Sequence, residues 1–141
     1  MKKIMIADPS KASLVMTSEV FKDNYPGISV HVAKTSHEAL EIAKSQINFD
    51  AFIIDYDLPD VDGAKTAYLL KQMSKTPILI TAFDRKDVCD SIDTTLSKFD
   101  DCRSWLRKPV NPEIVMAVVQ RYCEGKIRSQ KRIPCQLKGL A

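Results

Sequence analysis

The chain has 141 residues, of which 45% are hydrophobic and 28% charged, with only four glycines and seven prolines. This profile is typical of one globular domain and excludes a disordered or fibrous chain. No apolar run approaches the roughly 18–20 residues of a membrane-spanning helix. The stretch after Lys3 ends at Asp8, too soon for a signal peptide. We therefore expect a cytoplasmic protein without a membrane partner.

The formal charge of +3 is unevenly distributed along the chain. Five of the 21 cations and none of the 18 acids fall in residues 125–141, which leaves 16 cations against 18 acids in residues 1–124. We predict a slightly acidic domain over 1–124 and a basic tail or linker stub over 125–141. The tail has no aromatic residue and no helix-turn-helix pattern, so we favour a solvated extension over a segment that binds nucleic acid or an acidic partner.

Cysteines and histidines predict no metal centre. The four cysteines, at positions 89, 102, 123 and 135, include no C-x-x-C pair, so we expect reduced thiols and no structural zinc site. His31 and His37 fall on a predicted strand and at the start of the next helix, where surface or packing roles are expected.

Five β-type segments recur along the chain between turn residues. Three continuous apolar runs predict strands buried on both faces, whereas one alternating run and one weaker run predict edge strands. The buried runs are Ile4–Ala7, Ala51–Ile54 and Ile78–Ile80, and the edge runs are Ile28–Val32 and Ser104–Arg107.

Helical patterns alternate with these strands. Apolar spacing and capping residues predict helices over Lys11–Lys22, after the capping box Thr35–Glu38, over Gly63–Met73, around residues 88–96 and over Ile114–Tyr122. In Gly63–Met73 the spacing places Ala67, Leu70 and Met73 on one side. This alternation predicts an α/β fold, a doubly wound five-stranded parallel sheet with strand order 2-1-3-4-5.

Polar residues follow the predicted strands where each one ends. They are Asp8, Asp55-Tyr56-Asp57, Thr81 and Lys108. In a parallel sheet these ends share one crevice, where carboxylates suit Mg²⁺ and a lysine and a hydroxyl suit phosphoryl oxygens. Taken alone, Asp8 could be a helix N-cap and Asp55–Asp62 an acidic turn. Likewise, Thr81 could be an ordinary strand residue and Lys108 a solvated loop cation. The coincidence at four strand ends favours a phosphoryl site.

The chain resembles the receiver domains of two-component response regulators, the CheY-like family, over about residues 2–123. The matching segments are Ile4–Ser10, Phe52–Pro59, Asp62-Gly63, Thr76–Ala82 and Leu106–Pro109. The resemblance implies a flavodoxin-like (βα)5 fold. It also implies a signalling module, not an enzyme with an external substrate, that catalyses only its own phosphorylation and dephosphorylation.

The resemblance implies a role for each strand-end residue. Asp55 would accept a phosphoryl group from a sensor histidine kinase or a phosphotransfer protein. The carboxylates of Asp8 and Asp55, with the backbone carbonyl of Asp57, would hold Mg²⁺. Thr81 would donate a hydrogen bond to the phosphoryl group, and Lys108 would pair with it.

The resemblance also implies an output. Trp105 stands at the position of the family's aromatic switch, and its bulk leaves a fixed core anchor as an equal alternative. A switch there would reshape the face formed by the fourth helix, fifth strand and fifth helix, which would bind a downstream protein or a second copy in a homodimer.

Besides the bulk of Trp105, two departures from the family pattern stand out. The second acid after the first strand is replaced by Pro9, which should weaken Mg²⁺ binding unless Asp57 or Asp60 compensates. The stretch from Thr81 to Lys108 is about five residues longer than usual, with Phe99–Arg103 in place of the familiar Gly-Ala.

Two alternative functions remain. A degenerate receiver would act through protein contact without phosphorylation, and Pro9 is the support for it. A phosphohydrolase of the haloacid-dehalogenase type would use Asp55 and Asp57, but its Asp-x-Asp normally follows the first strand, whereas here it follows the third.

Overall fold

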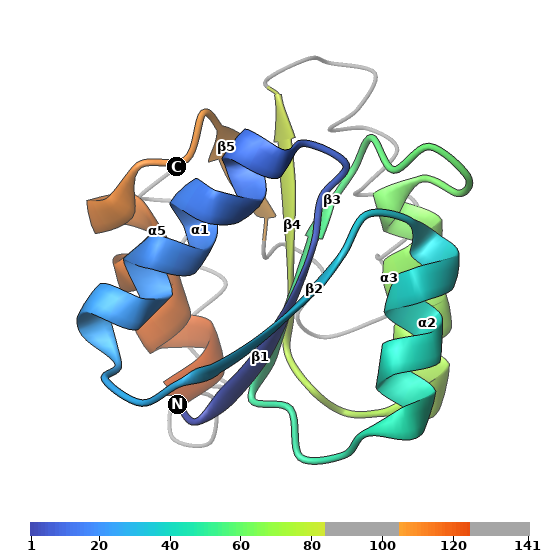
Figure 1. Cartoon of the computed structure of the whole chain (residues 1–141), viewed down its shortest axis with the longest axis horizontal. Helices are drawn as coiled ribbons and strands as arrows, with labels where there is room; N and C mark the ends of the chain where they lie inside the picture. Colours follow the sequence, from blue (N-terminus) through green and yellow to red (C-terminus); the bar gives the residue numbers. More distant parts are fainter. Residues whose placement is uncertain (84–104, 125–141) are drawn as a thin grey trace.

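The computed structural model describes residues 1–83 and 105–124, with the backbone alone for Trp105, Tyr122 and Glu124. The helix predicted around residues 88–96, the insertion Phe99–Arg103, three of the four cysteines and the basic tail lie outside these residues. Figure 1 therefore carries no label α4.

Five parallel strands form one sheet in the order β2-β1-β3-β4-β5, which confirms the predicted topology and its two edge strands (Figure 1). The strands are β1 (Lys3–Ala7), β2 (Ser29–Ala33), β3 (Ala51–Asp55), β4 (Ile78–Phe83) and β5 (Trp105–Lys108). Every residue of β3 is buried, whereas β2 is half-exposed, because β3 has a neighbour on each side and β2 has one. β4 extends beyond the predicted Ile80, so Thr81 lies within the strand.

Helices cover both faces of the sheet: α1 and α5 lie on one face, and α2 and α3 on the other (Figure 1). They are α1 (Lys11–Asn24), α2 (Ser36–Ser45), α3 (Gly63–Met73) and α5 (Pro112–Val119), and a π-helical turn η1 (Gln120–Glu124) extends α5. Of the three residues that the spacing places on one side of α3, Ala67 and Leu70 are fully buried, whereas Met73 at the end of the helix is 40% exposed. Among the described residues, no helix has the length and apolar character needed to cross a membrane.

Side chains alternate along each strand and divide the core into two apolar clusters. On the α1/α5 face the cluster includes Ile6, Ile53, Leu79 and Leu106. The residues two positions further along face the same side. They are Asp8, Asp55, Thr81 and Lys108. The alternation therefore brings the four predicted site residues to one face at the carboxyl edge of the sheet.

Polar side chains cap the helices. Ser10 is the N-cap of α1 and accepts from the Ser13 N–H at 3.2 Å, so the alternative that made Asp8 the cap is wrong. Thr35 accepts from the Glu38 N–H at 3.0 Å, as the capping box predicts. The Glu38 carboxylate accepts from the Lys34 N–H, one residue before the amide that a capping box uses.

Gly63 begins α3 against the end of β3. Its N–H donates to the Tyr56 carbonyl at 2.7 Å, which closes the intervening loop. A Cβ here would overlap the Asp55 carbonyl oxygen and lie 2.6 Å from the Tyr56 Cα. Because these are backbone atoms, no side-chain rotation would relieve the overlap, and only glycine fits.

We expect Gly63→Ala to lower the free energy of unfolding by about 1–3 kcal/mol, because the added methyl overpacks the base of the loop. Urea denaturation measures the loss. Gly27→Asn is the control, since Gly27 has a φ of +83° and open space where a Cβ would lie, and asparagine tolerates that conformation. A Gly63→Ala protein as stable as wild type would contradict the close approach.

Candidate functional site

Two carboxylates, a hydroxyl and an ammonium meet at the carboxyl edge of the sheet. Asp8 directly follows β1, Asp55 ends β3, Thr81 lies in β4 and Lys108 ends β5. Asp8, Asp55 and Thr81 are each at least 95% buried. The structure thus brings together four residues that the sequence predicts for the site, from strands separated by up to 100 residues of chain.

Lys108 links the two carboxylates. Its Nζ lies 2.9 Å from Asp55 Oδ1 and 3.3 Å from Asp8 Oδ2, and its side chain is only 11% exposed. The alternative of a solvated loop cation is therefore wrong. Phe83, which the sequence analysis missed, places its ring centroid 5.4 Å from the same Nζ and is itself 48% exposed.

Hydrogen bonds fix the orientation of both carboxylates. Asp55 Oδ1 also accepts from the Thr81 hydroxyl at 3.2 Å, and Oδ2 accepts from the Asp57 N–H at 3.2 Å. Asp8 Oδ1 accepts from the Ser10 N–H at 2.9 Å. Each carboxylate therefore has one oxygen on a backbone amide and the other on the shared ammonium.

Burial and charge shift two pKa values in the site. Burial raises the pKa of the Asp55 carboxyl and the Asp8 charge adds to the rise, while Lys108 and Thr81 oppose it incompletely. Burial also acts to lower the pKa of Lys108, but its hydrogen bonds to Asp55 and Asp8 and their charges outweigh burial and raise it. The ammonium stays charged, so two carboxylates share one cation and an excess of negative charge remains.

A small cavity extends the site beneath α1. It encloses about 40 Å³, and its lining combines Asp8, Thr81 and Lys108 with the apolar side chains of Met16 and Val110. The cavity borders Lys108 and the Asp8 carboxylate and lies between α1 and the β5–α5 connection.

The donors available for a metal are few. Pro9 is exposed and supplies no carboxylate, and the described residues contain no cluster of three or more His, Cys, Asp or Glu side chains suited to a metal. With the Asp57 carbonyl, which the resemblance implies as a third ligand, the Asp8 and Asp55 carboxylates would supply three oxygen donors. That set fits Mg²⁺, which takes oxygen ligands and keeps several waters.

Asp60 does not replace the missing acid. Its carboxylate accepts from the Ser36 N–H at 2.8 Å and the His37 N–H at 2.9 Å, at the start of α2. Its slight burial acts to raise the carboxyl pKa, but these backbone hydrogen bonds outweigh it and lower the pKa. Of the two acids that could compensate for Pro9, Asp60 is hydrogen-bonded to the start of α2, and Asp57 is exposed beside the site.

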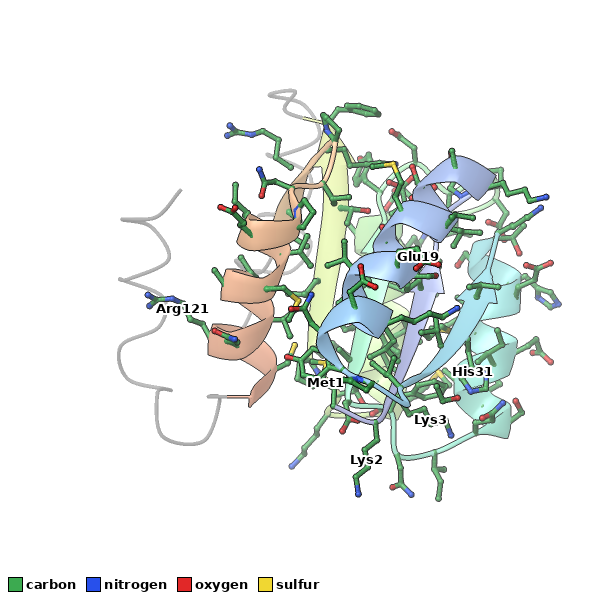
Figure 2. All side chains as sticks on the ribbon, turned by 60° about the vertical axis from the view of Figure 1, so that its left-hand side comes forward. Met1, Lys2, Lys3, Glu19, His31 and Arg121 are labelled. Atoms are coloured by element: carbon green, nitrogen blue, oxygen red, sulfur yellow. The ribbon has the colours of Figure 1, made fainter. Side chains whose placement is uncertain are left out.

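Of the two histidines, His31 lies away from the strand-end site, as expected, whereas His37 lies in the first turn of α2 beside the loop that follows β3. The His31 ring meets the Phe49 ring edge-on at 5.5 Å and lies toward the edge of the sheet where β1 begins, beside Lys3 in Figure 2. His37 contributes its backbone N–H to Asp60.

Comparison with known proteins gives the family. A family model described as "Response regulator receiver domain" matches residues 4–120. The chain belongs to this family. A solved structure of the chemotaxis response regulator CheY4 of Vibrio cholerae is similar, with 28% identity, a TM-score of 0.69, and coverage of 86% of this chain and 98% of that one. A CheY-like receiver domain from Methanospirillum hungatei has a TM-score of 0.73 at 19% identity, over 94% and 98% of the two chains, and supports the fold.

Curated relatives are much longer proteins. The sensor protein TorS of Escherichia coli is 24% identical over 132 residues, which cover 93% of this chain and 14% of that protein. The signal transduction histidine-protein kinase BarA of Escherichia coli is 26% identical over 125 residues, 86% of this chain and 13% of that protein. The receiver domain thus spans about one-seventh of each relative.

The family assignment argues against one of the alternative functions, the phosphohydrolase. Receiver domains are modules of two-component signalling and not classical enzymes, so the phosphohydrolase interpretation of Asp55-Tyr56-Asp57 is set aside. The backbone of Trp105 pairs with Ile80 in the sheet, as a β5 residue should. Its side chain lies outside the described residues, so the switch and anchor alternatives both stay predictions.

We expect Asp55→Asn to be more stable than wild type at neutral pH. Below the ordinary value of 3.8, Asp55 is protonated in the folded and the unfolded chain, and the two proteins should have similar stability. As the pH rises through the raised folded-state pKa, only wild type must ionise a buried carboxyl, so its relative stability falls. Urea denaturation between pH 3 and pH 8 measures the difference.

Asp60→Asn provides the control of opposite sign. The folded-state pKa of Asp60 is lowered, so its contribution is present above 3.8 and disappears as the pH falls through the folded-state value. This variant should be less stable than wild type at neutral pH and equal to it in acid. A wild type more stable than Asp55→Asn at neutral pH would contradict the raised pKa of Asp55.

Proposed function

We propose that this receiver domain accepts a phosphoryl group on Asp55, from a phosphohistidine of a sensor kinase or a phosphotransfer protein, with Mg²⁺ bound beside it. The observation that supports this most is the buried Asp55 carboxylate, held between the Lys108 ammonium at 2.9 Å and the Thr81 hydroxyl at 3.2 Å. An ammonium and a hydroxyl on a carboxylate oxygen are the groups that would stabilise an acyl-phosphate.

In the proposed transfer, an Asp55 oxygen attacks phosphorus as the phosphorus–nitrogen bond to the donor imidazole breaks, and the imidazole leaves with the electron pair of that bond. Lys108 then neutralises part of the charge on the phosphoryl oxygens, and Thr81 donates its hydroxyl hydrogen to one of them. Because Asp8 and Asp55 already share the single ammonium, a further cation is needed. Bound Mg²⁺ would supply that charge on the Asp8, Asp55 and Asp57 oxygens.

Exposed apolar side chains beside the site support docking of the phosphoryl donor. Val15 and Met16 of α1 are each 53% exposed, and Ile114 in the first turn of α5 is 57% exposed. Met16 and Lys108 both line the small cavity beneath α1. An apolar surface on two adjacent helices, next to the acceptor, suits a protein partner whose histidine must reach Asp55.

Incubation with acetyl phosphate and millimolar Mg²⁺ should add the mass of one phosphoryl group, measured by intact-protein mass spectrometry. Asp55→Asn should abolish the gain, because it removes the nucleophilic oxygen. Asp50→Asn, which changes the same charge at the opposite edge of the sheet, should retain it. No gain in wild type, and no binding of beryllofluoride, would instead support the degenerate receiver that Pro9 suggests.

Pro9→Asp should strengthen Mg²⁺ binding. The substitution restores an acid next to Asp8 at an exposed position, and a third carboxylate near the cation, besides those of Asp8 and Asp55, adds attraction of about 1.4 kcal/mol, or roughly tenfold in affinity. Isothermal titration calorimetry measures the affinity, and Pro9→Asn is the uncharged control. Equal affinities for Pro9→Asp and Pro9→Asn would show that the metal does not lie beside residue 9.

A further inference from the structure

The Asp60 carboxylate joins two segments that are far apart in sequence. Its two oxygens accept separately from the Ser36 and His37 amides, at 2.8 and 2.9 Å, across 24 and 23 residues of chain. These amides belong to the first turn of α2, where N–H groups have no partner within the helix. Thr35 takes the next amide, that of Glu38, so side chains satisfy three successive N–H groups.

A second contact joins the same two regions. The Thr66 hydroxyl in the first turn of α3 donates to Ser36 Oγ at 2.7 Å, and Thr66 and Ser36 are at most 1% exposed. The first residue of α2 is therefore bound on its backbone by the loop and on its side chain by α3. This anchor is buried and does not depend on Asp60, so the helix itself should stay in place when Asp60 is replaced.

The loop that carries Asp60 also forms one wall of the acceptor site. At its base, the Tyr56 N–H donates to the Thr81 carbonyl and the Gly63 N–H donates to the Tyr56 carbonyl. Between these points, the Asp57 N–H donates to Asp55 Oδ2 at 3.2 Å. Within the loop, Leu58 is buried in the core, and the exposed Asp60, three residues beyond Asp57, ties the loop to α2 by its two hydrogen bonds.

We propose that Asp60 is a positioning residue for the acceptor site: by fastening the loop to the first turn of α2, it holds the Asp57 backbone where its amide bonds Asp55 and its carbonyl meets the metal. This inference rests on the proposed function. The positioning of the Asp57 carbonyl matters more in this chain because Pro9 replaces an acid. A metal site with one carboxylate fewer depends more on a correctly placed carbonyl ligand.

The experiment compares Asp60→Ala and Asp60→Asn with a matched control in the full chain. Asp50→Ala is the control, because Asp50 also accepts from two backbone amides, those of Lys2 at 2.6 Å and Lys3 at 3.0 Å. Lys2 and Lys3 lie at the edge of the sheet where β1 begins, opposite the acceptor site (Figure 2). Calorimetry measures Mg²⁺ affinity, urea denaturation measures stability, and nuclear magnetic resonance measures hydrogen exchange of the Asp57 amide.

Asp60→Ala should weaken Mg²⁺ binding about tenfold and accelerate exchange at the Asp57 amide, as expected when a group that orients a ligand is lost. Asp60→Asn keeps one acceptor oxygen and should recover part of both. Asp50→Ala should lose stability without changing either. Rescue by asparagine separates positioning from charge, since alanine and asparagine remove the same charge.

Two results would overturn the inference while the proposed function stands: Mg²⁺ affinity in Asp60→Ala equal to that in Asp50→Ala, or equal losses in Asp60→Ala and Asp60→Asn, which would show a charge effect. If wild type binds no Mg²⁺, the proposed function is overturned instead. In that case, exchange at the Asp57 amide still decides the inference, because unchanged exchange in Asp60→Ala would show that Asp60 does not hold the loop.

Discussion

The site depends on one ammonium shared by two buried carboxylates. Without Lys108, Asp8 and Asp55 would face each other at no more than 4% exposure with no opposite charge. An uncompensated buried charge is far more costly than an exposed one. The Lys108 ammonium must therefore lie between the two carboxylates for both to be buried in the folded state. It arrives from β5, an edge strand, while the carboxylates come from the central strands β1 and β3. The charge balance therefore links the last strand of the domain to the first.

Strand alternation makes this meeting possible. Ile6, Ile53, Leu79 and Leu106 fill the core under α1 and α5, and the polar residues two positions later continue the same rows past the end of the apolar layer. Parallel pairing aligns the rows, with Asp55 beside Thr81 in the register of β3 and β4. The alternation of side chains between the two faces of the sheet thus places both the apolar core and the polar site. A shift of one residue in the register of any strand would move its polar residue to the other face.

Features that depend on the periodicity of apolar residues can be predicted from the sequence. Contacts that depend on the conformation of a loop cannot. The strand order and the bounds of α3 follow from apolar runs and from Asp62-Gly63, and all of these are confirmed. From the sequence alone, Asp8 before Pro9 could be the N-cap of the first helix, but in the structure Ser10 is the N-cap of α1. The hydrogen bonds of Asp60 reach across more than 20 residues, and nothing in the local sequence marks the Ser36 and His37 amides as its partners.

The loss of an acid at Pro9 changes what the remaining groups must do. In a site with more carboxylates, charge alone attracts a divalent cation, and small displacements of a carbonyl ligand are tolerated. Here two carboxylates carry one excess negative charge after pairing with Lys108, so geometry matters more. Under the proposed function, the loop after β3 would supply that geometry, and loops are held in place by the hydrogen bonds of their backbone and side chains. Under the proposed function, a carboxylate that binds no metal, such as Asp60, would influence metal binding through the loop that it holds.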